Sequence, residues 1–172
     1  MNDCIIYVAT KMSNRDRVEM IERAHYVCET LERYGLTPIS PILVENVENK
    51  PGKLTQTSEE QLKQFWTRDK DIIAYEAHVV LCDNAQHKSY GVEREYGFAR
   101  YCLWKPTISI VPPDTGFIVS TFEDDIVVNS VEAAARLIAR NWGTPWKRRL
   151  WRLQMIKRTL AKFLWRQLCQ WR

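Results

Sequence analysis

One segment in the middle of the chain carries side chains that could bind a phosphate and attack a sugar. It runs from Asp83 to Arg100, with Gly91 at the expected start of a helix and Ser89 two residues earlier. The free N–H groups and the dipole of a helix start favour an anion, a glycine lets the backbone approach it, and a serine adds a hydroxyl donor. Glu95 follows one helical turn later, where a carboxylate would meet a sugar whose phosphate rests on the helix start.

Further cationic and hydroxyl side chains could contribute to the same anion site. Lys88 directly precedes the serine, and Lys11, Ser13 and Arg15 follow the first apolar segment of the chain. Those three residues could equally form an ordinary helix start in which Ser13 is the N-cap. Glu95, taken alone, could belong to the solvated face of a helix. Both interpretations stay open at this level.

The elements that would position these residues alternate regularly along the chain. Short apolar segments predict strands at 5–9, 37–43, 77–82, 106–111 and 125–128, and amphipathic patterns predict helices at 15–34, from 57 towards 75, at 92–103 and at 130–142. This alternation predicts one α/β domain over residues 1–143, a doubly wound, mostly parallel five-stranded sheet of flavodoxin-like or Rossmann-like type. The two prolines of 37–43 favour an edge strand. Ligands of such sheets bind beyond the carboxyl ends of the strands.

The segment Gly91-Val92-x-x-Glu95-x-Gly97-x-Ala99, followed by Lys105-Pro106 and an apolar strand, resembles the signature of the nucleoside 2-deoxyribosyltransferase family. The resemblance covers roughly residues 4 to 111. It implies a two-step displacement in which Glu95 attacks the anomeric carbon and forms a covalent glycosyl intermediate. It also implies that Tyr7, in the first strand, holds Glu95 in place through its hydroxyl.

The resemblance further implies a second carboxylate on the helix before the third strand. The family's Asp lies about eight residues before an acid that opens that strand. Here His78 stands at the opening position, and counting back eight residues gives Lys70, with Asp69 and Asp71 on either side. We expect Asp69 to be the second catalytic carboxylate, with Asp71 in reserve. Either acid could instead be a surface carboxylate paired with Arg68 or Lys70.

The residue two positions before Gly91 bears on the reaction. The family's transferases keep an Asp there, whereas Ser89 is similar to the relatives that hydrolyse deoxynucleoside 5′-monophosphates. An Asp would repel a 5′-phosphate, and a Ser can donate a hydrogen bond to it. We therefore expect an N-glycosidase that acts on nucleotides. A deoxyribosyltransferase is the nearest alternative, and a non-catalytic nucleotide-binding module is an alternative of another class.

The end of the chain differs in composition from the rest. Residues 147–172 hold nine Lys or Arg and no acid, which leaves 16 basic and 21 acidic residues elsewhere. Apolar residues at steps of three and four predict one basic amphipathic helix within a tail at 144–172. Residues 146–172 could pack in a homodimer or higher homo-oligomer, or bind an anionic membrane surface. Nucleic acid is a less favoured partner.

The remaining features point to an enzyme that works inside the cell without a cofactor. The five cysteines form no CxxC pair and are expected to be reduced core residues. Two of the three histidines, His25 and His78, have no metal-ligand spacing, so neither a metal nor an organic cofactor is expected. The first residues lack a signal-peptide pattern, which predicts a cytoplasmic protein, at most peripheral on the inner membrane face. Trp66 and Trp104 are expected in the core, and Phe117 in a loop that could cover the site.

Overall fold

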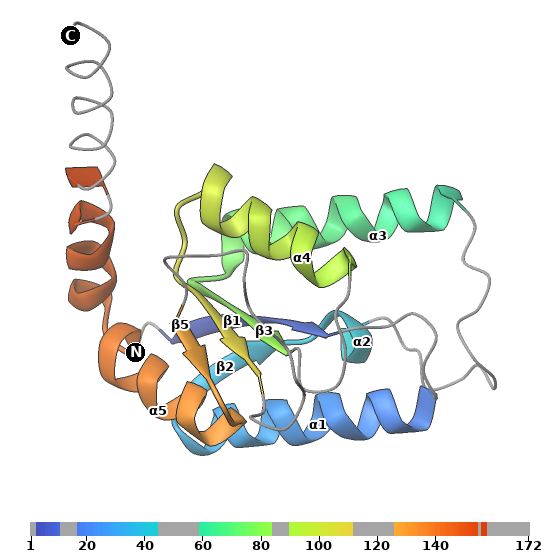
Figure 1. Ribbon diagram of the computed structural model, residues 1–172, viewed down its shortest axis with the longest axis horizontal. Coiled ribbons are helices and arrows are strands. Elements are labelled where there is room, and N and C mark those ends of the chain that lie inside the picture. Colours follow the sequence, from blue (N-terminus) through green and yellow to red (C-terminus); the bar gives the residue numbers. More distant parts are fainter. Residues whose placement is uncertain are drawn as a thin grey trace, which may run out of the picture.

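The computed structural model describes residues 3–10, 17–44, 59–83, 90–111, 126–154 and 156–157. Its centre is a five-stranded, all-parallel sheet in the order β2-β1-β3-β4-β5 (Figure 1). The strands are β1 (Cys4–Thr10), β2 (Leu36–Ile39), β3 (Val79–Asp83), β4 (Thr107–Ile110) and β5 (Ile126–Val128). The predicted α/β fold is confirmed, and the proline-containing strand β2 lies at an edge as expected.

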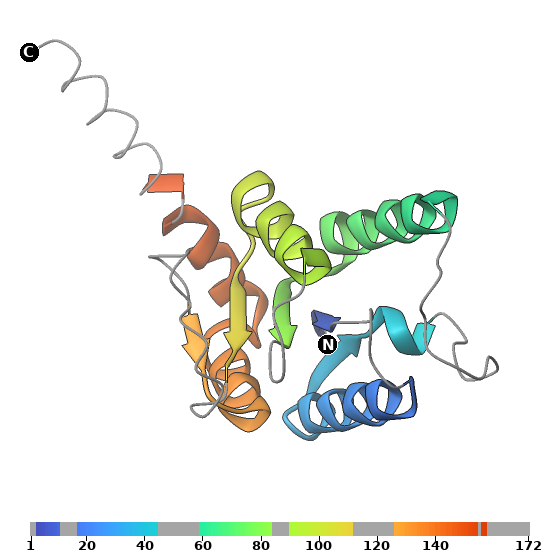
Figure 2. The same ribbon diagram turned by 45° about the vertical axis from the view of Figure 1, so that its right-hand side comes forward.

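Helices cover both faces of the sheet (Figures 1 and 2). One face carries α1 (Arg17–Arg33) and α5 (Val131–Trp142). The other carries α3 (Glu59–Asp71) with the π-helical turn η2 (Ile72–Glu76), and α4 (Tyr90–Gly97) with the π-helical turn η3 (Phe98–Cys102). The chain leaves β1 for α1 on one face and β3 for α4 on the other. The crevice between the carboxyl ends of these two strands is therefore the topological switch point, where such sheets bind their ligands.

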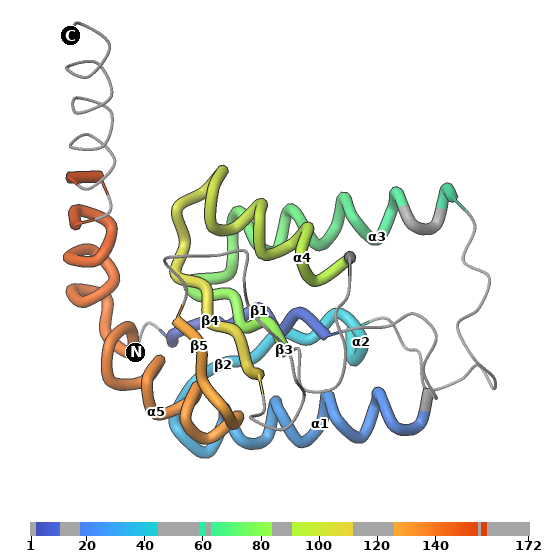
Figure 3. The backbone as a smooth tube through the Cα atoms, viewed as in Figure 1, coloured from blue at the N-terminus to red at the C-terminus, as the bar shows by residue number. Residues whose placement is uncertain are grey.

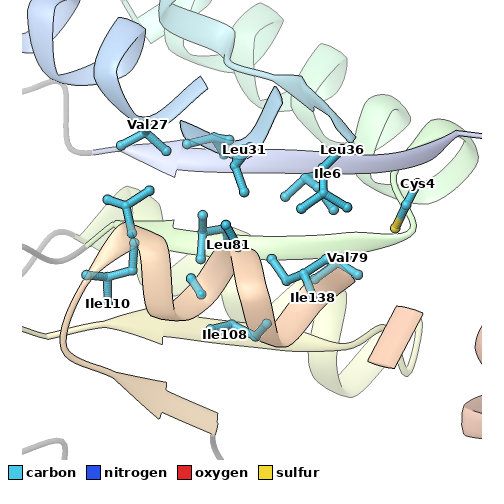
Figure 4. Packing of buried hydrophobic residues seen from close by; sticks show 14 of the residues in the cluster. Cys4, Ile6, Val27, Leu31, Leu36, Val79, Leu81, Ile108, Ile110 and Ile138 are labelled. Carbon is cyan, nitrogen blue, oxygen red and sulfur yellow. The ribbon is translucent and has the colours of Figure 1, made fainter. Parts of the chain in front are cut away.

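Alternate residues of the central strands feed two separate cores. Ile6 of β1 and Leu81 of β3 are fully buried under α1 and α5, where they pack with Ile108 and Ile138 (Figure 4). Burial of each such side chain contributes roughly 1.5–3 kcal/mol. Tyr7 points to the opposite face and joins the core beneath α3 and α4. The period of two along β1 thus places Tyr7 under the helix that carries Glu95.

Two local features of the first half differ from the prediction. The strand expected at 37–43 ends at Ile39, because Pro41 begins the short helix α2 (Pro41–Val44), and a proline without an N–H group is well suited to a first helical turn. Val18 fits the apolar pattern that predicts the helix at 15–34, but it is 64% exposed, whereas Met20 is fully buried. Gly35, with a φ of 71°, ends α1 as predicted.

A second helical segment follows α5 at residues 145–154 and 156–157, here called the arm. The tube in Figure 3 shows it beside the amino ends of the strands, where the chain also begins. Trp151 of the arm packs edge-on against Trp142 of α5, with ring centroids 6.4 Å apart. The rest of the helix predicted within 144–172 lies outside the described residues. Within the part of the chain that the structure describes, no helix is both long and apolar enough to span a membrane.

Candidate functional site

A buried tyrosine connects the central strand β1 to helix α4. The Tyr7 hydroxyl donates a hydrogen bond to Oε1 of Glu95 at 2.9 Å. Tyr7 is fully buried, and Glu95 keeps part of its surface accessible. Val92, Tyr96 and Ala99 turn the same face of this helix towards the sheet, so the helical period directs Glu95 to β1.

Asp69 of α3 completes a cluster of two carboxyl groups around the tyrosine. Its side chain is buried and also shares a hydrogen bond with the Tyr7 hydroxyl. Its Oδ1 atom accepts hydrogen bonds from Nε and Nη2 of Arg68, at 3.1 and 2.7 Å. Asp71, the reserve candidate, is exposed. The structure thus brings together Tyr7, Asp69 and Glu95, and leaves Asp71 outside the cluster.

A π-helical turn explains the spacing of Asp69. Helix α3 continues into η2, where the Ala77 N–H bonds to the carbonyl of Ile72 at 2.9 Å, five residues back. A π turn holds one residue more than an α-helical turn. The segment between Asp69 and the start of β3 is therefore one residue longer than a regular helix requires. Counting back eight residues from His78 therefore selects Lys70, although Asp69 is the residue that faces Tyr7.

The helices that carry the two acids are held together next to the cluster. Trp66 of α3 meets Phe98 edge-on, with ring centroids 5.8 Å apart. The guanidinium of Arg94 lies 4.1 Å from the centroid of the same indole, a cation–π contact. Trp66 is therefore half-buried between helices and does not belong to the core in which it was expected. Trp104, expected in the core, is 39% exposed, so that prediction is wrong.

The cluster strongly perturbs the titration of its members. Burial, followed by the charge of Asp69, raises the pKa of Glu95 to about 8, while hydrogen bonding by Tyr7 and the charge of Arg68 oppose the rise. Burial also raises the pKa of Asp69, against the hydrogen bond and charge of Arg68. The pKa of Tyr7 lies far above its usual range, first through burial and then through the two carboxylates. Two interacting carboxyl groups titrate as a pair, and this pair retains a proton at neutral pH.

Most of the expected phosphate ligands lie outside the described residues. These are Lys11, Ser13, Arg15, Lys88 and Ser89, together with Phe117. Gly91 is described, and it is exposed in the first turn of α4. The expected anion site at this helix start therefore stays a prediction.

Two arginines form ion pairs near the candidate site, and only Arg68 was considered as a partner from the sequence. Besides Arg68, Arg23 of α1 forms a two-pronged ion pair with Asp83 at the carboxyl end of β3, with Nε–Oδ2 and Nη2–Oδ1 distances of 2.8 and 3.0 Å. The one signal in the sequence is the position of Asp83 directly after four apolar residues. A carboxylate at the end of a buried strand needs a cationic or hydrogen-bonding partner, but nothing identifies Arg23 as that partner.

Other side chains that could do chemistry have structural surroundings. Nδ1 of His78 accepts the Ile5 N–H at 2.9 Å and so connects the starts of β1 and β3, and His25 is exposed on α1. Cys4, Cys28 and Cys82 are buried, whereas Cys102 is exposed, against expectation. Among the described residues, no three His, Cys, Asp or Glu side chains converge where a metal ion could bind.

A large hollow on the surface does not coincide with this cluster. It has a volume of about 1050 Å³ and follows the outer side of α3, where the described lining includes Arg68 and Asp71. None of Tyr7, Asp69 and Glu95 lines it. Four of its lining residues are acidic, and acids repel a phosphate, so we place the candidate site at the tyrosine and not in this hollow.

The described chain is thus a Rossmann-like α/β protein in which two carboxyl groups meet at a buried tyrosine. Its structure is similar to that of a 2-deoxyribosyltransferase from Bacillus psychrosaccharolyticus, a biocatalyst for the synthesis of antiviral and antitumoral nucleosides. The two share 21% sequence identity over 76% of this chain and 90% of that chain, with a TM-score of 0.55. At this identity the similarity establishes a common fold. No protein-family model matches the chain, and no curated protein matches its sequence.

Proposed function

We propose that this protein is an N-glycosidase that hydrolyses the base–sugar bond of 2′-deoxynucleoside 5′-monophosphates. The observation that carries the proposal is the hydrogen bond from Tyr7 to Glu95 beside the buried carboxyl group of Asp69. Retaining glycosidases use a pair of carboxyl groups. One attacks the sugar as a carboxylate, and the other, whose pKa is raised, donates and accepts the proton. The family resemblance of the Gly91 to Ala99 segment gives the same assignment.

The reaction divides into two displacements at the anomeric carbon. In the first, a Glu95 carboxylate oxygen bonds to this carbon, the carbon–nitrogen bond breaks, and the leaving base takes the electron pair and a proton from Asp69. In the second, Asp69 removes a proton from water, whose oxygen attacks the same carbon and releases Glu95. The products are the free base and deoxyribose 5-phosphate, with one water consumed.

The reaction can begin only when the proton shared by the two carboxyl groups is on Asp69. The attack needs Glu95 ionised and Asp69 protonated. In the empty site the pKa of about 8 keeps the proton on Glu95, and Arg68 favours an ionised Asp69. Because the Tyr7 hydroxyl is hydrogen-bonded to both acids, it offers a short path by which this proton can cross from Glu95 to Asp69. Substrate binding would then have to drive this transfer.

A deoxyribosyltransferase is the second candidate, because the similar solved structure is one. The two activities share the first displacement and differ in the acceptor that enters the second, which is water for a hydrolase and a free base for a transferase. Ser89 supports a substrate with a 5′-phosphate, since an Asp at this position would repel it. The reaction requires neither a metal nor an organic cofactor.

The test is to incubate the protein with each common deoxynucleoside 5′-monophosphate and each deoxynucleoside, with and without a second free base, and to separate the products by chromatography. Glu95→Gln is the test variant, and Glu93→Gln, two residues away on the same helix, is the matched control. We expect base release from nucleotides by the wild type and by Glu93→Gln, and none by Glu95→Gln. Base exchange on nucleosides would move the assignment to the transferase.

A third result would refute both activities. If the folded wild type binds nucleotides in equilibrium dialysis but releases no base and exchanges none, the protein is a binding module and the carboxyl pair has another role. If Glu95→Gln releases base as fast as the control, Glu95 is not the nucleophile.

A further inference from the structure

The arm presents an exposed apolar stripe. Trp146, Leu150, Leu153 and Ile156 are 62, 46, 57 and 42% exposed, respectively. Their steps of three and four residues place them along one side of the helix. Single exposed apolar residues are ordinary, but a continuous stripe on one helix indicates a binding surface.

Contacts on its other side fix the orientation of the arm. Trp151 packs against the core that lies under α5, and Nη1 of Arg148 donates a hydrogen bond to the Trp142 carbonyl at 3.1 Å. Arg148 also forms a hydrogen bond with Cys4, the first residue of β1. The stripe therefore lies on the side of the arm away from these contacts, and the arm itself lies beside the amino ends of the strands (Figure 3). Substrate would enter at the opposite, carboxyl ends.

Cationic side chains accompany the stripe. Arg149, Arg152 and Lys157 are exposed on the arm, and residues 147–172 contain nine Lys or Arg and no acid. Arg149 and Lys157 follow Trp146 and Leu153, respectively, by one helical turn, so charge and apolar surface alternate on one face. This is the composition of helices that lie in the plane of a membrane interface.

A tryptophan outside the arm adds to the same surface. Trp104 has a φ of 54°, in the left-handed region that is unfavourable for a bulky residue. It lines a cavity of about 320 Å³ together with Arg152 and Ile156 of the arm and the buried Lys105. The strained backbone thus accompanies a partly exposed indole beside the arm, where apolar and cationic groups meet.

We propose that the arm and Trp104 dock on a membrane surface that contains anionic phospholipids. The indoles of Trp104 and Trp146 would lie at headgroup level, Leu150 and Leu153 would enter the acyl boundary, and the arginines would meet lipid phosphates. A nucleic acid would bind the cationic side chains but would not account for the exposed leucines. A symmetric contact between two arms would place cations against cations. The proposal is independent of the reaction, because the arm lies away from Tyr7 and Glu95.

Flotation of the full-length protein with lipid vesicles tests this proposal. We expect the wild type to float with vesicles of phosphatidylcholine mixed with phosphatidylglycerol, and to stay behind with phosphatidylcholine alone. Leu150→Ser with Leu153→Ser keeps every charge and should weaken binding roughly tenfold for each leucine removed from the acyl boundary. Arg149→Gln with Arg152→Gln should weaken binding and reduce its salt dependence. Val44→Ser removes an exposed apolar residue of α2 and should change nothing.

Four results would overturn the proposal. The first is no flotation of folded wild type, and the second is equal flotation of the double leucine variant. The third is an oligomer, measured by light scattering, that the double leucine variant dissociates while vesicles bind neither protein, which would make the stripe a subunit contact. Binding to duplex DNA that needs the arginines but not the leucines, without flotation, would assign the surface to nucleic acid. Circular dichroism establishes that each variant is folded.

Discussion

The pKa of Glu95 makes the stability of this protein depend on pH in a calculable way. The folded state holds a proton on Glu95 up to a pH of about 8, whereas an ordinary glutamate has lost it above 4.5. Between these values the folded state binds the extra proton, so the free energy of unfolding must fall as the pH rises. At roughly 1.4 kcal/mol for each pH unit, the full loss approaches about 5 kcal/mol.

Glu95→Gln isolates this contribution, because the amide keeps an oxygen that accepts the Tyr7 hydrogen bond and cannot ionise. We expect the two proteins to be similarly stable near the lower end of the window, and the variant to become steadily more stable than the wild type as the pH approaches 8. Urea denaturation at several pH values measures the difference. Asp69→Asn removes a charge that raises the pKa of Glu95, so it should narrow the pH range over which the free energy of unfolding falls. A difference between wild type and Glu95→Gln that stays constant with pH would refute the reasoning.

Three further predictions follow from individual contacts. Tyr7→Phe removes a hydrogen bond that lowers the pKa of Glu95, so the fall of kcat/KM at high pH, where the carboxyl pair loses its last proton, should move to higher pH, and the free energy of unfolding should fall by about 1–2 kcal/mol. Arg23→Met removes the guanidinium partner of buried Asp83 and should lower the free energy of unfolding by about 3–5 kcal/mol. In a double-mutant cycle, Arg23→Met with Asp83→Asn should lower it by less than the sum of the two single variants. Ile138→Ala opens a cavity under the sheet and should lower the free energy of unfolding, measured by urea denaturation, by about 2–5 kcal/mol. The dependence of this free energy on urea concentration should not change.

The fold could be predicted because buried parallel strands and amphipathic helices leave distinct periods in the sequence. The apolar segments at β1, β3 and β4 are such strands, and Gly35 marks the end of α1. The errors arose where the composition suits two structures. The apolar residues after Pro41 fit a strand as well as a helix, and only the proline's missing N–H group favours the helical turn. Val18 shows that an apolar residue at the end of a helix can lie outside its buried face.

The members of the candidate site differ in how far the sequence could identify them. Tyr7 and Glu95 come from regular elements, so a motif and the strand and helix periods together suffice to place them. Arg68 is the sequence neighbour of Asp69, so its ion pair could be considered from the sequence. Arg23 pairs with Asp83 across 60 residues, and a single sequence holds no signal for such a partner. The exposure of Trp104 depends on one positive φ angle, and residue type alone predicts the opposite.

The position of Asp69 depends on a residue far from the reacting groups. The π turn that adds a residue before β3 leaves helix carbonyls without their regular partners, and a buried carbonyl without a partner is costly. Lys105, at the start of β4, donates hydrogen bonds from Nζ to the carbonyls of Ala74 and Ala77, at 2.9 and 2.6 Å. Burial, with the nearby charge of Arg152, lowers the pKa of this lysine to about 8. The Lys-Pro pair after the helix therefore stabilises the turn that directs Asp69 to Tyr7, which gives a structural reason why a lysine suits this place in the motif.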